Sequence, residues 1–199
     1  MKLPELHAEQ ITTFQYEWTQ QWHSTPTSPQ DEMPWSQIEQ NHRMNFALWH
    51  EEDIARRDDL GAERIREAKR TIDSCNQARN NAVEQMDAWI KERLPPAPDG
   101  TPLHSETPGM IIDRLSILAL KHYHMCEEAQ RESAGEEHRQ QCGIKAKQIQ
   151  SQLADLGECL EILLQQLAQG ERTFKLYKQF KMYNDPALNP QLYQNPDLK

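Results

Sequence analysis

Residues 65–91, IREAKRTIDSCNQARNNAVEQMDAWIK, decide the fold class because their apolar residues recur at helical spacing. Projected at about 100° per residue, these apolar residues fall on one face of a helix. They are Ile65, Ala68, Ile72, Cys75, Val83, Met86 and Ile90. The stretch contains no glycine or proline to interrupt a helix. It therefore predicts a long amphipathic helix, from about residue 62 to 93, with one face in a protein core.

A second, polar stripe borders the apolar stripe on this helix. Its members are Lys69, Asp73, Asn76, Asn80, Glu84, Asp87 and Lys91. Asparagine forms helices poorly, so two asparagines would be an unusual choice for a solvated face. Amides beside carboxylates suit either a polar network closed between helices or a pocket that binds a ligand or hydrated cation. Both interpretations stay open, and Arg79, within the apolar stripe, is expected to pair with an acid or a ligand anion.

The rest of the chain also favours helices, because only seven of its 199 residues are glycine. We predict one all-α domain over residues 1–199, a helical bundle of four main helices with further N-terminal and C-terminal helices. The predicted parts are an N-terminal helix and proline-rich loop (1–34), two helices with polar stripes (35–93), a proline-rich connector (94–105), the remaining helices (106–184) and an extended tail (185–199).

Within residues 106–184, three features are predicted. Thr107 and Pro108 suit the N-cap and first position of a helix that runs to about residue 133. A leucine seam follows at alternating three- and four-residue steps, formed by Ile149, Leu153, Leu156, Leu160, Leu163 and Leu167. Packing inside the bundle is the favoured role of this seam, and a homodimer is the alternative. A last short helix is predicted for residues 171–184.

Composition and charge narrow the classes of function. The formal net charge of −9 argues against a general nucleic-acid-binding protein. No run of apolar residues approaches the length of a membrane span, and the N-terminus lacks the apolar region of a signal peptide. The four cysteines form no C-x-x-C pair and are interpreted as buried or half-buried thiols in a reducing compartment. We therefore expect a cytoplasmic protein.

Two other predicted helices carry polar residues on faces that also hold apolar ones. On the helix of residues 35–60, Trp49 and Asp53 share a face with Asn45, while His50 and Arg57 lie beside it. In the run MIIDRLSILAL (110–120), Asp113 is surrounded by apolar residues, and a buried carboxylate needs a partner. The candidate partners are Arg114, Lys69, Arg57 and Lys121.

Four segments resemble a bacterial all-helical family known as a domain of unknown function. They are LWHEED (48–53), KRTIDSCNQARNN (69–81), ETPGMIIDRLSILALKHYHM (106–125) and KQFKMYNDPALNP (178–190). The resemblance extends from about residue 35 to 193 and implies a small cytoplasmic protein. It also implies a context of cell-envelope polysaccharide synthesis, but it brings no activity with it.

These patterns lead to a leading hypothesis and two alternatives. We expect a polar pocket between helices that binds a small anionic metabolite, such as a nucleotide or sugar-phosphate, in cell-envelope glycan synthesis. The expected ligand-binding residues are Trp49, Arg57, Lys69, Asp73, Asn76, Asn80, Asp113 and Arg114. His50 and Asp53, at i and i+3, are the candidate base and its orienting acid.

Glu84 and Asp87 are the candidate ligands of a Mg²⁺ or Mn²⁺ ion. The first alternative is therefore a magnesium-dependent enzyme similar to helical nucleotide pyrophosphohydrolases. The E-x-x-E motif of those enzymes is not met here, since only the second carboxylate pair is present. The second alternative is a non-catalytic adaptor, in which the polar stripes are structural and the leucine seam or the basic C-terminal segment binds a protein.

Overall fold

The computed structural model describes residues 6–25, 28–178, 185 and 187–194, and these residues are all-helical with no strand. The helices are α1 (Ala8–Trp22), α2 (Trp35–Ala55), α3 (Ala62–Glu92), α4 (Pro108–Gln130), α5 (Glu136–Gln169) and the short α6 (Pro190–Tyr193). The predicted helices up to residue 169 are confirmed, although α2 ends five residues before the predicted position. None of the described helices combines the length and apolar character that crossing a membrane requires.

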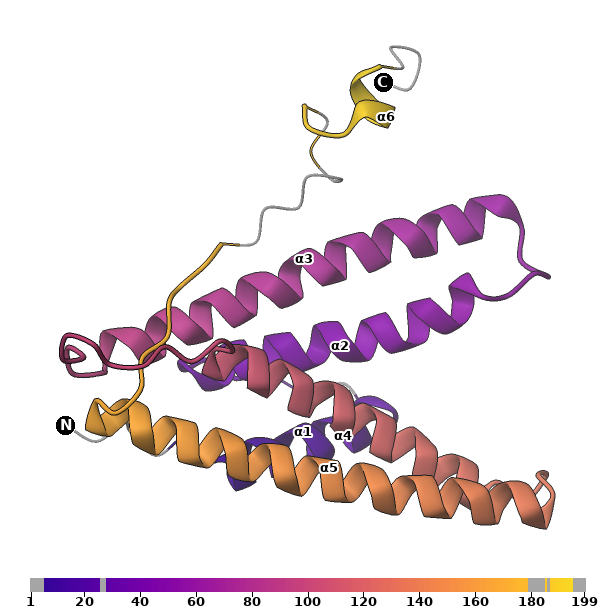
Figure 1. Ribbon diagram of the computed structural model, residues 1–199. Helices are drawn as coiled ribbons and strands as arrows, with labels where there is room; N and C mark the ends of the chain where they lie inside the picture. The colour runs from indigo at the N-terminus through magenta and orange to yellow at the C-terminus, as the bar shows by residue number, and fades with distance from the viewer. Residues whose placement is uncertain (1–5, 26–27, 179–184, 186, 195–199) are drawn as a thin grey trace.

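The five long helices form two pairs with α1 between them. Helix α2 packs along α3, helix α4 packs along α5, and α1 contacts α2, α4 and α5 (Figure 1). Because α2 and α4 also pack on each other, the polar faces of α2, α3 and α4 meet in the middle of the molecule. This junction is where the candidate site lies.

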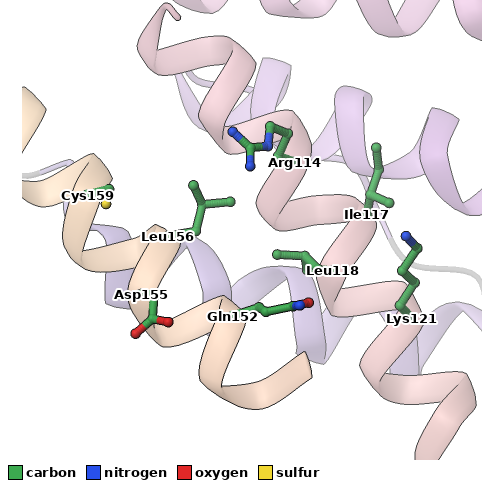
Figure 2. A pocket seen from close by; sticks show the side chains of 8 residues that line it. All are labelled: Arg114, Ile117, Leu118, Lys121, Gln152, Asp155, Leu156 and Cys159. Atoms are coloured by element: carbon green, nitrogen blue, oxygen red, sulfur yellow. The ribbon is translucent and has the colours of Figure 1, made fainter. Parts of the chain in front are cut away.

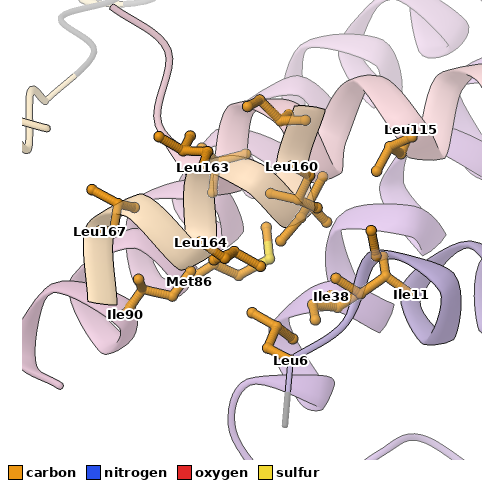
Figure 3. Packing of buried hydrophobic residues seen from close by; sticks show 14 of the residues in the cluster. Leu6, Ile11, Ile38, Met86, Ile90, Leu115, Leu160, Leu163, Leu164 and Leu167 are labelled. Carbon is orange, nitrogen blue, oxygen red and sulfur yellow. The ribbon is translucent and has the colours of Figure 1, made fainter. Parts of the chain in front are cut away.

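The main hydrophobic core is built from α1, α3, α4 and α5 together with Ile38 of α2 (Figure 3). The apolar stripe of α3 supplies Val83, Met86 and Ile90 to it. The predicted stripe is confirmed as buried except at Ile65, which is half-buried. The second half of the leucine seam is buried in the same core, at Leu160, Leu163 and Leu167. Packing within the chain therefore occupies this part of the seam.

The start of α4 is fixed by three hydrogen bonds. The hydroxyl oxygen of Thr107 accepts the backbone N–H of Met110 at 3.2 Å, as predicted for an N-cap. The backbone N–H of Gly109 donates to the carboxylate of Asp87 on α3 at 2.7 Å, and Thr107 also bonds to that carboxylate. A negative charge at the N-terminus of a helix is favourable, because the first N–H groups lack partners within the helix.

Gly109 is predicted to be intolerant of a side chain. A Cβ atom there would lie 2.8 Å from Oδ1 of Asp87 and 2.9 Å from the backbone oxygen of Val83. We expect Gly109→Ala to lower the free energy of unfolding by about 2 kcal/mol, because backbone must move. Gly143→Ala, in the interior of α5 with open space around it, is the control and should raise stability by about 0.5–1 kcal/mol. Urea unfolding of both variants checks this, and equal effects would contradict it.

The predicted helix over residues 171–184 is wrong for the part that the structure describes, and residues 179–184 lie outside the described residues. Helix α5 ends at Gly170, which adopts a left-handed conformation with φ of 74°. The backbone then bonds to the connector, since Thr173 donates to Pro102 and accepts from His104. Phe174 is buried in the main core. These contacts hold the segment extended, and the tail likewise contains α6 where only extended chain was predicted.

The cysteines are free thiols, and their burial is less uniform than predicted. Cys75 and Cys142 are buried and Cys126 is half-buried, as expected, but Cys159 is exposed on α5. Burial raises the pKa of the Cys75 and Cys126 thiols, so both favour the protonated form.

Candidate functional site

A polar pocket opens at the junction of α2, α3 and α4, with a volume of about 350 Å³. This size falls in the range of small-molecule sites. Its lining residues are Asn45, Leu48, Trp49, Glu52, Asp53, Arg56, Asn76, Arg79, Ile117 and Leu120. We call it the junction pocket. Of the expected site residues, Trp49, Asp53 and Asn76 line it.

A hydrogen-bond network between α2 and α4 lies next to the junction pocket. Oδ1 of Asp113 accepts from the side-chain amides of Asn41 at 2.8 Å and Asn45 at 2.9 Å. The same Asn45 amide donates to the hydroxyl of Ser116 at 2.9 Å. The network continues to His42, whose ring lies 2.8 Å from Ser116. A polar network between α2 and α4 therefore lies next to an open pocket, and of the polar stripe of α3 only Asn76 lines that pocket.

Arg79 joins the network to the pocket. Its guanidinium donates to the side-chain oxygen of Asn45 at 3.2 Å, and its Nε lies 3.7 Å from Oδ1 of Asp113. This confirms the expectation that Arg79 pairs with an acid. The distance to Asp113 is too long for a hydrogen bond, and Nε of Arg79 is a buried donor with no hydrogen-bond partner among the described residues. The expected partners of Asp113, the cations Arg114, Lys69, Arg57 and Lys121, were therefore the wrong ones.

The rim of the pocket carries Arg56, not the expected Arg57. Arg56 follows the last residue of α2 and pairs with Glu52 at 2.9 Å. Arg57 lies in the loop after α2, where it is exposed and bonds to Asp59. The helical face predicted for Asn45, Trp49 and Asp53 also contains Arg56, and this face lines the pocket, whereas Arg57 lies beside that face and beyond the end of the helix.

Several expected ligand-binding residues lie outside the junction pocket. Lys69 and Asp73 pair with each other on an exposed part of α3. Asn80 is buried and lines a separate cavity between α3 and the segments around residues 105–110 and 175–178. Arg114 pairs with Glu106, since one guanidinium nitrogen donates to both carboxylate oxygens, at 2.8 and 2.9 Å.

Arg114 also borders a groove between α4 and α5. Figure 2 shows its lining side chains, which include Arg114, Ile117 and Lys121 from α4 and Asp155 and Leu156 from α5. Ile117 lines both this groove and the junction pocket, so α4 separates the two. Among the described residues, no buried polar side chain lines this groove, whereas the buried Asn45 lines the junction pocket.

The expected metal ligands Glu84 and Asp87 line the same cavity as Asn80. Asp87 already accepts hydrogen bonds from Gly109 and Thr107 at the start of α4. Burial raises the pKa of Asp87 to about 6, although these two hydrogen bonds oppose the shift. Its carboxylate therefore acts as a helix cap in this structure, a role the spacing of α3 alone could not indicate.

His50 is not hydrogen-bonded to Asp53 in the described structure. Its ring lies against His23 at 5.3 Å and His124 at 5.7 Å, measured between centroids. Burial lowers the pKa of His50, and so do the charges of His23 and His124 when protonated. Trp49 stacks on His124 at 4.7 Å with an interplanar angle of 10°, so this group of histidines adjoins the junction pocket.

Comparison with known proteins gives one family. The sequence model of the family described as "Protein of unknown function (DUF4254)" matches residues 35–176. No curated protein and no solved structure matches the chain. The matched range contains every residue of the junction pocket, whereas α1 precedes it.

Proposed function

The chain belongs to the DUF4254 family, and we propose that it binds a small anionic metabolite, a nucleotide or sugar-phosphate, in the junction pocket. The observation that carries the proposal is Arg79, a half-buried cation on the pocket wall with an unpartnered buried donor. A buried N–H without an acceptor is costly, and a phosphate oxygen would supply that acceptor.

The other lining residues suit the remainder of such a ligand. Trp49 offers an aromatic surface for a base or sugar ring. The amides of Asn45 and Asn76 and the carboxylate of Asp53 suit hydroxyl groups. Arg56 at the rim adds a second cation. The pocket thus combines a charged end with polar and aromatic walls, as ligands that join a phosphate to a sugar require.

Calorimetric titration tests the proposal with UDP, GDP, UDP-glucose, glucose 1-phosphate and pyrophosphate. We expect at least one to bind, and we expect Arg79→Lys to weaken that binding by about tenfold or more, because lysine lacks the planar fork of arginine. Arg66→Lys is the matched control, since Arg66 lies on α3 but pairs with Glu63 in solvent. Absence of binding by the whole panel, or equal affinity of both variants and the unaltered protein, would contradict the proposal.

A further inference from the structure

Three histidines from three helices meet beside the junction pocket. His23 follows the last residue of α1, His50 lies on α2 and His124 on α4. One ring nitrogen from each histidine lies within 4.8 Å of those of the other two. We propose that His23, His50 and His124 bind a divalent transition-metal ion of the Zn²⁺ class, and we call them the histidine triad.

Hydrogen bonds fix which nitrogen of two of these rings carries the proton. Nδ1 of His23 lies 2.7 Å from the backbone oxygen of Thr19, and Nδ1 of His124 lies 2.7 Å from the carboxylate of Glu127. A carbonyl or ionised carboxylate oxygen can only accept, so each Nδ1 donates, and in the neutral ring each Nε2 keeps its lone pair. Metal-binding histidines typically make this second hydrogen bond, because it orients the ring and makes it a better ligand.

A second observation in favour of a metal site concerns Nε2 of His124. This atom is buried and has no hydrogen-bond partner among the described residues. An aromatic cluster alone would leave such a lone pair unsatisfied, at a cost in free energy. A metal ion within the triad would satisfy it.

The surroundings suit a cation held by neutral imidazoles. Phe46, Trp49 and Tyr123 pack against the triad, and Trp49 and Tyr123 both contact His124.

The geometry also indicates the type of ion and the movement that binding needs. Neutral imidazoles suit Zn²⁺ and its neighbours in the first transition row, whereas Mg²⁺ prefers oxygen ligands.

Tetrahedral coordination at about 2.0–2.1 Å places ligand nitrogens about 3.4 Å apart, so the rings would have to approach one another. His23 is exposed and follows the last residue of α1, so a small shift of this helix end can bring its ring closer while the hydrogen bond to Thr19 is kept. Three protein ligands leave a fourth position for water or a ligand.

The test uses untagged protein freed of metal, titrated with Zn²⁺ or Co²⁺ alone. We expect one ion per chain, a Co²⁺ absorption spectrum typical of four-coordinate nitrogen ligation, and a higher melting temperature with Zn²⁺. Each of His23→Gln, His50→Gln and His124→Gln should lower the affinity by about tenfold or more. Glu127→Gln should lower it by about 10- to 100-fold.

His122→Gln is the matched control, since His122 lies on the same helix with its ring against Tyr16. His23→Gln changes an exposed side chain, so it keeps the test valid if a more buried variant fails to fold. No binding by the unaltered protein, or an equal loss in His122→Gln and His23→Gln, would overturn the proposal. Because no anionic metabolite is present, this result is independent of ligand binding in the junction pocket.

Discussion

Replacing Asp113 with alanine is expected to lower the free energy of unfolding by about 3 kcal/mol. The substitution removes the acceptor of Asn41 and Asn45 and leaves the Arg79 guanidinium without its counter-charge. Breaking one partner of a buried ion pair costs about 3–5 kcal/mol. We expect the lower end, because the side chains of Arg79 and Asp113 stay 25% and 17% exposed.

A double-substitution cycle separates the ion pair from the rest of the network. If the cost of Asp113→Ala comes from an uncompensated Arg79, then Arg79→Met in the same chain should recover part of it. Glu106→Ala is the control, because Glu106 also pairs with an arginine but on the surface, where such pairs contribute about 0–1 kcal/mol. Denaturant unfolding of Asp113→Ala, Arg79→Met, the double variant and Glu106→Ala gives the four differences from the unaltered protein, and additive effects of the Asp113 and Arg79 substitutions would show that the pair is not coupled.

The apolar pattern of the sequence was sufficient to predict the helices, because each helix buries one stripe and the stripe repeats at about 3.6 residues. On α3 it located Ile72, Val83 and Met86 in the buried face. It failed for residues 171–178 because periodicity cannot show that the connector binds this backbone. There, one buried side chain, Phe174, and two backbone hydrogen bonds outweigh the helical preference.

The polar stripe of α3 shows why the site was only partly predictable. From Lys69 to Lys91 it extends over about 33 Å of helix, which is too long to face one neighbour. Asp73 pairs with Lys69 at the surface, and Asn76 lines the junction pocket. Asp87 accepts a hydrogen bond from Gly109 at the start of α4. A helical projection identifies the face of each residue, but the neighbour depends on where α2 ends and α4 begins.

The histidine triad could not be predicted from the sequence, for a related reason. His23, His50 and His124 show no metal-binding spacing, since they come from three helices separated by long stretches of chain. Only the packing of α1 on α2 and α4 brings them together. The sequence did predict a role for His50, but with Asp53 as its partner. The i, i+3 spacing of these two residues can be seen in the sequence, whereas a contact between distant segments cannot.

The second large predicted effect is on the pH dependence of the free energy of unfolding, and it arises from His42 and Asp87. His42 is fully buried: its Nδ1 lies 2.8 Å from the Ser116 hydroxyl, and its Nε2 lies 2.9 Å from Thr19, whose hydroxyl donates to the backbone of Gln15. The neutral ring satisfies both neighbours. Burial therefore lowers the pKa of His42 from 6.5 to about 3, while it raises the pKa of Asp87 from 3.8 to about 6.

These two shifts have opposite consequences. Below pH 6.5 the unfolded chain protonates His42 and the folded chain does not, so stability falls by about 1.4 kcal/mol for each unit that the pH is lowered toward 3. Between pH 3.8 and 6 the folded chain keeps a proton on Asp87 that the unfolded chain has lost. Stability therefore falls at a similar rate, about 1.4 kcal/mol per unit, as the pH is raised through that window.

Between about pH 4 and 6 the contributions of His42 and Asp87 to the pH dependence of the free energy of unfolding should largely cancel. A variant that lacks one of these groups should therefore show the pH dependence of the other. Relative to the unaltered protein, His42→Gln should gain about 2.5 kcal/mol on going from pH 6 to pH 4, and Asp87→Asn should lose about 2 kcal/mol. The test is the slope of the difference with pH, measured by urea unfolding, because the structural cost of each substitution is the same at every pH. A pH-independent difference for His42→Gln would show that His42 titrates normally in the folded state. The double variant should return to a constant difference, since both proton-linked contributions are then gone.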